Sequence, residues 1–294
     1  MKTFIRLPKT MLIAAAVVAL MTGATAQARA EGKTSDLHYV AVGVSKMPLM
    51  PQNHQLRYPH KDAKDLAKVW EAQKGKLYAN VHGETLTDET AKLADILAAL
   101  DRMVANAKTG DTAVVSLAGH GGKVAFLNNQ WIFEPSDVDP RNATATLLTE
   151  KHLRDRLSQL TARSVTVILV LDTCQAGAFS TGDSGIVVLG GCTATQSSAD
   201  HNTIANGYFT FALIEALNGK ADANGDGEIT LEEIQAFVAV RVPELTKLYA
   251  VTINGSRHEQ TPVCFLPAGS LSGKPLTCGT VTVQMPGINM DRVR

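Results

Sequence analysis

Short apolar runs rich in Val, Ile and Leu alternate along this chain with segments of helical periodicity. The most apolar run covers residues 165–171, and similar runs cover residues 39–44 and 112–118. A strand buried on both faces of a sheet has this continuous apolar character, because helices cover both of its sides. The helical segments between such strands supply crossover connections. The sequence therefore predicts an α/β sandwich around a mainly parallel sheet.

The longest helical pattern lies in residues 88–107, where apolar side chains recur at the three- and four-residue spacing of a buried stripe. Turn-forming residues Asn128 and Asn129 predict a polar hairpin. The remaining elements expected are helices over 62–73, 150–160, 209–217 and 232–248, a weak strand over 77–81 and a strand over 185–189. Residues 269–294 are rich in Gly and Pro and are expected to form a tail without regular structure.

The N-terminus has the three parts of a secretory signal peptide. Basic residues precede an uncharged apolar run over 11–21, and Ala28 and Ala30 provide the small side chains of a cleavage site. Eleven apolar residues are too few for a membrane-spanning helix, which needs about 20. We therefore expect cleavage after Ala30, removal of residues 1–30, and a soluble secreted or periplasmic protein with no membrane association.

The charge of the mature chain argues against a nucleic-acid partner. The full sequence has 28 basic and 28 acidic side chains, and residues 1–30 hold four of the basic ones and none of the acidic ones. Removing these 4 from 28 leaves 24 basic groups against 28 acidic ones, a net charge of −4. Nucleic-acid-binding domains usually carry a basic face, and this sequence predicts none.

Four cysteines are too few for a disulfide scaffold in a chain of this length. Export would allow disulfides, and Cys264 and Cys278 are the candidate pair for one bridge. Cys192 follows an apolar, Gly-rich segment and is expected to be a small buried hydrophobic side chain.

Reactive residues follow two of the predicted strands. His120 stands between glycines after residues 112–118, and Cys174 follows the strand over 165–171. Ligands of open α/β sheets bind beyond the carboxyl ends of the strands, so these side chains are expected at one edge. An imidazole beside a thiol increases the thiolate fraction and returns a proton to the leaving amine. The backbone N–H groups of Gly121 and Cys174 are candidates to stabilise a tetrahedral oxyanion.

Gly-His-Gly after one strand and Asp-x-Cys-x-x-Gly after the next resemble the signature of caspase-type cysteine peptidases, particularly metacaspases and their bacterial relatives. The resemblance extends from about Tyr39 to Phe265. It implies a caspase-like fold over residues 31–268, with His120 as base and Cys174 as nucleophile. Further matching segments are Leu56-Arg57, Asp62-Ala63, Gly110-Asp111, Pro135-Ser136-Asp137, Gly207-Tyr208-Phe209-Thr210 and Gln260-Thr261-Pro262.

The charge beside the nucleophile predicts the substrate class. Asp172 lies two residues before Cys174, so in an extended strand both side chains point the same way. A carboxylate there suits an Arg or Lys side chain at the cleavage position. The resemblance to metacaspases implies that Asp62 completes this acidic pocket. The alternative for Asp62 is an acid in the first turn of a helix, favoured by the helix dipole.

Residues 222–233 match the twelve-residue calcium-binding loop. Oxygen ligands fall at the required positions, and a glycine occupies the sixth position, where the chain must turn sharply. The predicted ligands are Asp222, Asn224, Asp226, Glu228, Thr230 and Glu233. The alternative is a helix start in which Thr230 and Glu233 form a capping box without an ion. The histidines show no zinc-ligand spacing.

These patterns predict an exported cysteine endopeptidase that cleaves polypeptides after Arg or Lys. No Lys or Arg lies between Arg163 and Lys220, so such an enzyme would not cut itself there and is expected to work as one chain and a monomer. The competing hypothesis is a catalytically silent, calcium-stabilised binding module. It is motivated by Gln175-Ala176, which stand where the family usually has His-Ser. A third hypothesis, an acyl-transfer or hydrolase enzyme on another α/β scaffold, is not favoured, because no Gly-x-Ser-x-Gly elbow is present.

Overall fold

The computed structural model describes residues 35–179, 185–249, 252–253, 256–267 and 271–280. The predicted signal peptide lies outside these residues. Within them, no helix combines the length and apolar character needed to cross a bilayer.

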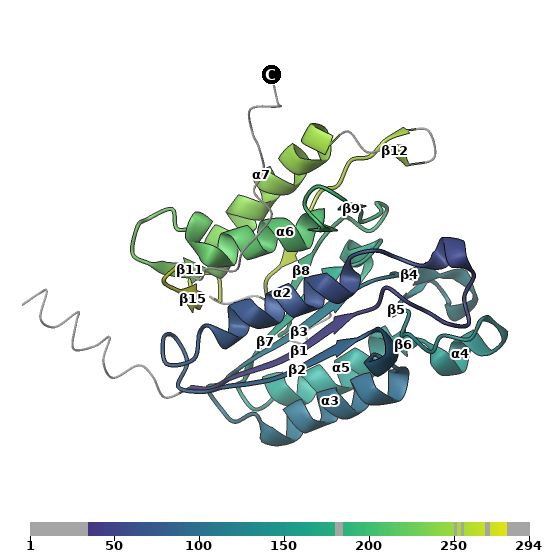
Figure 1. Ribbon diagram of the computed structural model, residues 1–294. Coiled ribbons are helices and arrows are strands. Elements are labelled where there is room, and N and C mark those ends of the chain that lie inside the picture. Colours follow the sequence, from purple (N-terminus) through teal and green to yellow (C-terminus); the bar gives the residue numbers. More distant parts are fainter. Residues whose placement is uncertain (1–34, 180–184, 250–251, 254–255, 268–270, 281–294) are drawn as a thin grey trace, which may run out of the picture.

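In the described part of the chain, six strands form a central sheet in the order β14–β8–β7–β3–β1–β2 (Figure 1). All neighbouring pairs are parallel except β14 and β8, which are antiparallel. The strands are β1 (Leu37–Gly43), β2 (Val81–Thr87), β3 (Thr112–Ala118), β7 (Thr166–Asp172), β8 (Val187–Gly190) and β14 (Val263–Phe265). The mainly parallel α/β sandwich is therefore confirmed.

Helices cover both faces of this sheet and bury an apolar core on each side. On one face lie α2 (Pro59–Glu71), α6 (Tyr208–Glu215) and α7 (Leu231–Tyr249), and on the other lie α3 (Leu93–Asn106) and α5 (Glu150–Thr161) (Figure 1). The central strands β1, β3 and β7 are buried almost throughout, which explains their continuous apolar sequences.

Smaller sheets lie around the main one. They are β4 (Gly121–Val124) with β5 (Gln130–Phe133) and β6 (Leu148–Thr149), β9 (Asp200–His201) with β10 (Asn206–Gly207), β11 (Glu228–Thr230) with β15 (Pro275–Cys278), and β12 (Thr252–Ile253) with β13 (Ser256–Arg257). Single turns include η1 (Gln52–His54), η2 (Asp88–Thr90), η5 (Ala176–Ala178) and the short α4 (Ala143–Thr146). The predicted hairpin is β4–β5, and Asn128 and Asn129 in its turn have positive φ.

Two predicted elements were wrong in position. The weak strand expected over 77–81 is instead β2, which begins at Val81 and pairs with β1 along its whole length. The long helix does not begin at Asp88: α3 begins at Leu93. The Asp88 carboxylate turns away and accepts hydrogen bonds from the backbone N–H of Ser45 and Lys46, at 2.7 and 2.9 Å. This contact holds the chain just after β1.

The C-terminal region also differs from the patternless tail that was expected. Residues 275–278 form β15, which pairs antiparallel with β11. Cys278 lies in this strand, whereas Cys264 lies in β14 of the central sheet, and no disulfide joins the two. Residues 281–294 lie outside the described part.

Candidate active site

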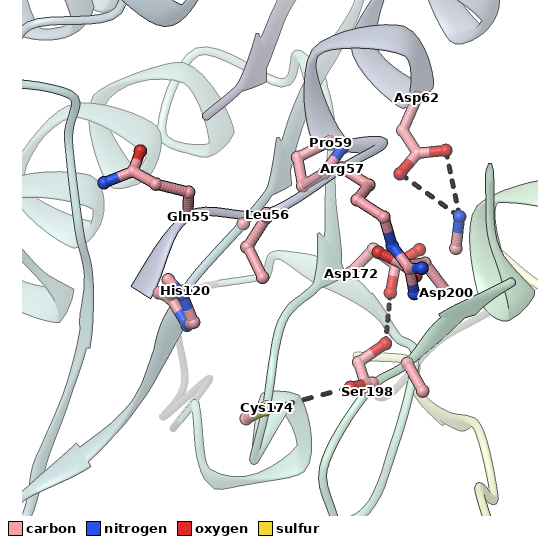
Figure 2. A pocket seen from close by; sticks show the side chains of 13 residues that line it. Gln55, Leu56, Arg57, Pro59, Asp62, His120, Asp172, Cys174, Ser198 and Asp200 are labelled. Atoms are coloured by element: carbon pink, nitrogen blue, oxygen red, sulfur yellow. Dashed lines mark hydrogen bonds and ion pairs between the residues drawn. The ribbon is translucent and has the colours of Figure 1, made fainter. Parts of the chain in front are cut away.

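Strand register brings His120 and Cys174 to one end of the sheet. β3 and β7 are parallel neighbours, and Ala118 pairs with Asp172 at their carboxyl ends. His120 and Cys174 each follow their paired residue by two positions. Both line a pocket of about 350 Å³, which Asp62 and Asp172 also line (Figure 2).

The His120 imidazole is held by a carbonyl group. Its Nε2 lies 2.8 Å from the carbonyl oxygen of His54 in η1. A carbonyl oxygen can only accept, so Nε2 donates its proton and Nδ1 keeps a free electron pair. Burial lowers the pKa of His120, which favours the neutral imidazole. This arrangement suits a general base.

The turn after β7 presents the thiol of Cys174. Gln175 adopts a left-handed conformation with φ of 52°, and its backbone N–H donates to the carbonyl of Gln196 at 2.8 Å. Its side-chain oxygen accepts a hydrogen bond of 2.8 Å from the backbone N–H of Lys123 in β4. Gln175 thus joins the nucleophile turn to the β4–β5 hairpin, which gives this unusual residue a structural role.

Glycine is required beside this turn. A Cβ atom on Gly121 would lie 2.8 Å from the carbonyl oxygen of Ile132 and 3.0 Å from the Cβ of Thr173. The backbone of Gly121 can therefore lie against the chain just before Cys174. The second thiol nearby belongs to Cys192, which is fully buried as expected. Burial raises the pKa of that thiol to about 12, so it stays protonated and unreactive.

Two buried carboxylates form the floor of the pocket. Asp172 is 7% exposed and accepts hydrogen bonds from the hydroxyls of Ser198 and Thr210 and from the backbone N–H of Thr210. Asp62, in the first turn of α2, is 2% exposed and accepts from the side chain of Asn206 at 2.7 Å and the backbone of Gly207 at 3.2 Å.

Burial raises the pKa of both carboxyl groups. For Asp62, the neighbouring charge of Asp172 raises the pKa further, so the two groups are close enough to repel each other. An incoming cation would relieve this repulsion. The pocket is therefore electrostatically suited to a positively charged side chain.

Two residues of the pocket, Asp200 and Ser198, were not predicted from the sequence. Asp200 in β9 lines the pocket and forms an ion pair of 2.8 Å with Arg57, another lining residue, whose side chain reaches toward Asp200 and Asp172 (Figure 2). Ser198 hydrogen-bonds Asp172, and its carbonyl oxygen lies 4.0 Å from the Cys174 sulfur. Asp200 lies in β9 and Ser198 lies just before it, and neither belongs to a local sequence motif.

The calcium-like loop lies apart from the pocket, between α6 and α7. Gly225 and Gly227 have positive φ, and the Asp222 carboxylate accepts hydrogen bonds from the backbone N–H groups of both. Thr230 and Glu233 form the reciprocal hydrogen bonds of a capping box at the start of α7. In the described residues, no group of three or more His, Cys, Asp or Glu side chains is arranged to hold a metal ion.

Comparisons with known proteins agree with this architecture. A family model described as the caspase domain matches residues 39–267. No curated protein matches the chain in sequence. The crystal structure of a protein from Geobacter sulfurreducens is similar, with 18% sequence identity and a TM-score of 0.57 over 83% of this chain and 99% of that one. This second likeness shows a shared fold alone. Because the family model covers well over half of its length, the chain belongs to the caspase-domain family of cysteine peptidases.

Proposed function

We propose that this protein is a cysteine endopeptidase that uses His120 and Cys174 and cleaves peptide bonds after Arg or Lys. The observation that carries the proposal is that one pocket is lined by His120, Cys174 and the two buried carboxylates of Asp62 and Asp172. Buried carboxylates that repel each other reduce the stability of the fold. A catalytically silent binding module would gain nothing from this cost, whereas a peptidase would use the two carboxylates to bind its substrate.

The chemistry follows from the tautomer of His120. Its Nδ1 takes the proton of the Cys174 thiol, and the thiolate attacks the carbonyl carbon of the scissile peptide. The backbone N–H groups of Gly121 and Cys174 are proposed to donate to the resulting oxyanion. The imidazolium then protonates the leaving amine, which breaks the C–N bond and leaves an acyl-enzyme. Water, deprotonated by His120, hydrolyses this thioester and restores the thiol.

Specificity is proposed to come from charge. A guanidinium or ammonium group entering the pocket would meet Asp62 and Asp172 in a site from which water is largely excluded. Charge-assisted hydrogen bonds there are worth more than exposed ion pairs. Asp200 offers a further carboxylate in the lining of the pocket, where the substrate would compete with Arg57.

The test is a panel of fluorogenic peptides that differ only at the cleavage position, with Arg, Lys, Asp or Gln. We expect hydrolysis of the Arg and Lys peptides and none of the Asp peptide. Cys174→Ala should abolish turnover, and His120→Gln should reduce it by about 100-fold or more. Preferential hydrolysis of the Asp peptide would overturn the pocket assignment, and turnover by Cys174→Ala would overturn the mechanism.

We further propose that the mature protein is exported after removal of residues 1–30 and acts as a monomer. We also propose that residues 222–233 bind Ca²⁺ through Asp222, Asn224, Asp226, Glu228, Thr230 and Glu233. The twelve-residue pattern and the left-handed glycines of the loop support this second site. Binding would require the Glu233 side chain to turn from its cap toward the ion.

A further inference from the structure

The imidazole of His120 contacts the ring of His54 as well as its carbonyl group. We propose that His54 and Glu134 are positioning residues for His120: the Glu134 carboxylate fixes His54, and the ring and carbonyl of His54 fix the catalytic imidazole. The inference rests on the proposed role of His120 as a base.

Four contacts connect His54, His120 and Glu134, so that each of the three residues contacts the other two. The rings of His54 and His120 are stacked, with centroids 4.1 Å apart and an interplanar angle of 25°. His120 Nε2 donates to the His54 carbonyl at 2.8 Å. His54 Nε2 lies 2.6 Å from a carboxylate oxygen of Glu134. The backbone N–H of Glu134 in turn donates to the His120 carbonyl at 3.0 Å.

The contact between Glu134 and His54 matters because the His54 carbonyl lies in η1, a weakly packed turn. None of the residues of η1 is buried. Packing therefore does little to hold the His54 carbonyl in place, whereas Glu134 ties it to the end of β5. A small displacement of a catalytic group can cost about 100-fold in rate. The turn itself is held independently, because the Gln55 side chain hydrogen-bonds the backbone of Met47 and Met50. Variants at Glu134 should therefore still fold.

The two residues also act on the charge of His120, and they do so in opposite directions. The imidazole of His54 disfavours a positive charge on His120 and lowers its pKa, whereas the Glu134 carboxylate raises it. The other titratable or charged groups that line the pocket with His120 are Cys174, Arg57, Asp62, Asp172 and Asp200. Removing one member of the pair at a time should shift the pKa of His120 in opposite senses.

The first experiment measures steady-state hydrolysis of an Arg peptide by Glu134→Ala, Glu134→Gln and His54→Phe. We expect Glu134→Ala to lower kcat by about 10- to 100-fold with KM within about twofold, because the pocket carboxylates are untouched. Glu134→Gln keeps an oxygen acceptor for His54 and should recover part of the loss. The matched control is His82→Phe, since His82 is also stacked on a histidine and paired with a carboxylate, Asp36, at 3.2 Å.

The second experiment does not depend on peptidase activity. NMR titration of the His120 ring in the Cys174→Ala background should give a lower pKa for Glu134→Gln and a higher pKa for His54→Phe, with no change for His82→Phe. Shifts in the same direction, or none, would overturn the inference, as would a change in KM with kcat preserved. A wild-type enzyme that hydrolyses no peptide would overturn the proposed function, while the titration would still report on His54 and Glu134.

Discussion

At the scale of single residues, Asp62 and Asp172 place two carboxyl groups inside the fold at an energetic cost. Both are buried, and the pKa of each is raised by that burial. In an unfolded chain these carboxyl groups ionise near pH 4, whereas in the folded protein they resist ionisation. Their contribution to stability is thus fully present below about pH 4 and is lost as the pH rises through their raised pKa values. At neutral pH the two carboxyl groups therefore reduce the stability of the folded protein. We propose that the protein keeps them because they bind the substrate.

The substitution Asp62→Asn should therefore separate stability from activity. The new amide side chain keeps an oxygen for Asn206 and Gly207 but removes the buried charge. We expect a higher unfolding temperature than wild type at pH 7 and no difference near pH 3. We also expect kcat/KM for an Arg peptide to fall about 30-fold or more, which is ~2 kcal/mol. An unchanged unfolding temperature at pH 7 together with full activity would contradict the proposed pocket.

The same carboxylates set a pH dependence for substrate binding. Because the pKa of each group is raised, both become neutral at a higher pH than exposed aspartates do on acidification. We expect KM for an Arg peptide to rise as the pH falls through these values, while KM for a peptide with Gln at the cleavage position stays constant. Measuring both peptides in parallel from pH 8 to pH 4 checks this, and parallel KM curves would count against it.

Gly207 tests how closely the backbone must approach the pocket floor. A Cβ atom added there would overlap the Asp172 carboxylate, although the φ of −63° suits any residue. We expect Gly207→Ala to push this carboxylate aside and reduce kcat/KM for Arg peptides by about 10-fold or more. Gly273→Ala is the matched control, since nothing lies within 4 Å of its added Cβ. Equal activity of the two variants would show that Asp172 does not contact substrate.

Residue patterns could predict only part of this site. His120 and Cys174 were predictable because glycines and apolar strands mark them within a few residues of sequence. Glu134 and Asp200 could not be identified, because they act through contacts with His54 and Arg57, which lie far away along the chain. Such pairing leaves no local signature in a single sequence.

At the scale of elements, burial decided which strands could be predicted. β3 is buried throughout and β7 at all but its first residue, and both stand out as apolar runs. β2 is an edge strand of intermediate to exposed residues, so its polar sequence gives only a weak strand signal, and its pairing with β1 along its whole length defines it as a strand. β15 is short, begins with Pro275 and depends on β11, which lies far from it in sequence. Elements defined by distant partners were therefore the ones displaced or missed.

The proposed calcium loop includes β11 and leads directly into α7, so calcium binding there should affect the stability of the fold. Its last predicted ligand, Glu233, now caps α7. If Ca²⁺ binds, it should raise the unfolding temperature, since a ligand at 100 times its Kd stabilises by about 2.7 kcal/mol. Glu233→Gln keeps an acceptor oxygen for the cap but loses the charge, so it should fold normally and lose the calcium response. Differential scanning calorimetry of the wild type and Glu233→Gln with EDTA or with CaCl₂ at about 5 mM, roughly five times the Kd of the weakest calcium loops, checks this. Identical wild-type curves would remove the calcium site.

At the scale of the whole molecule, the pocket is assembled from distant parts of one chain. α2 supplies Asp62, β7 supplies Asp172, and β9 and β10 supply Asp200 and Gly207 to the lining of the pocket. The chain between Cys174 and β8 connects two neighbouring strands of the central sheet, since β7 precedes it and β8 follows it. Cutting the chain there would leave both fragments bound in the same sheet.

The sequence of that segment predicts that it stays intact. Residues 164–219 contain no Lys or Arg, so an enzyme directed to basic residues has no site there. We expect purified wild-type protein to remain uncut over 164–219 during full peptidase turnover, as mapped by mass spectrometry. Cys174→Ala, incubated in parallel, controls for contaminating proteases. A Cys174-dependent cut within 164–219 would show that the enzyme accepts other residues at the cleavage position, and it would contradict both the single-chain mechanism and the acidic pocket as its source of specificity.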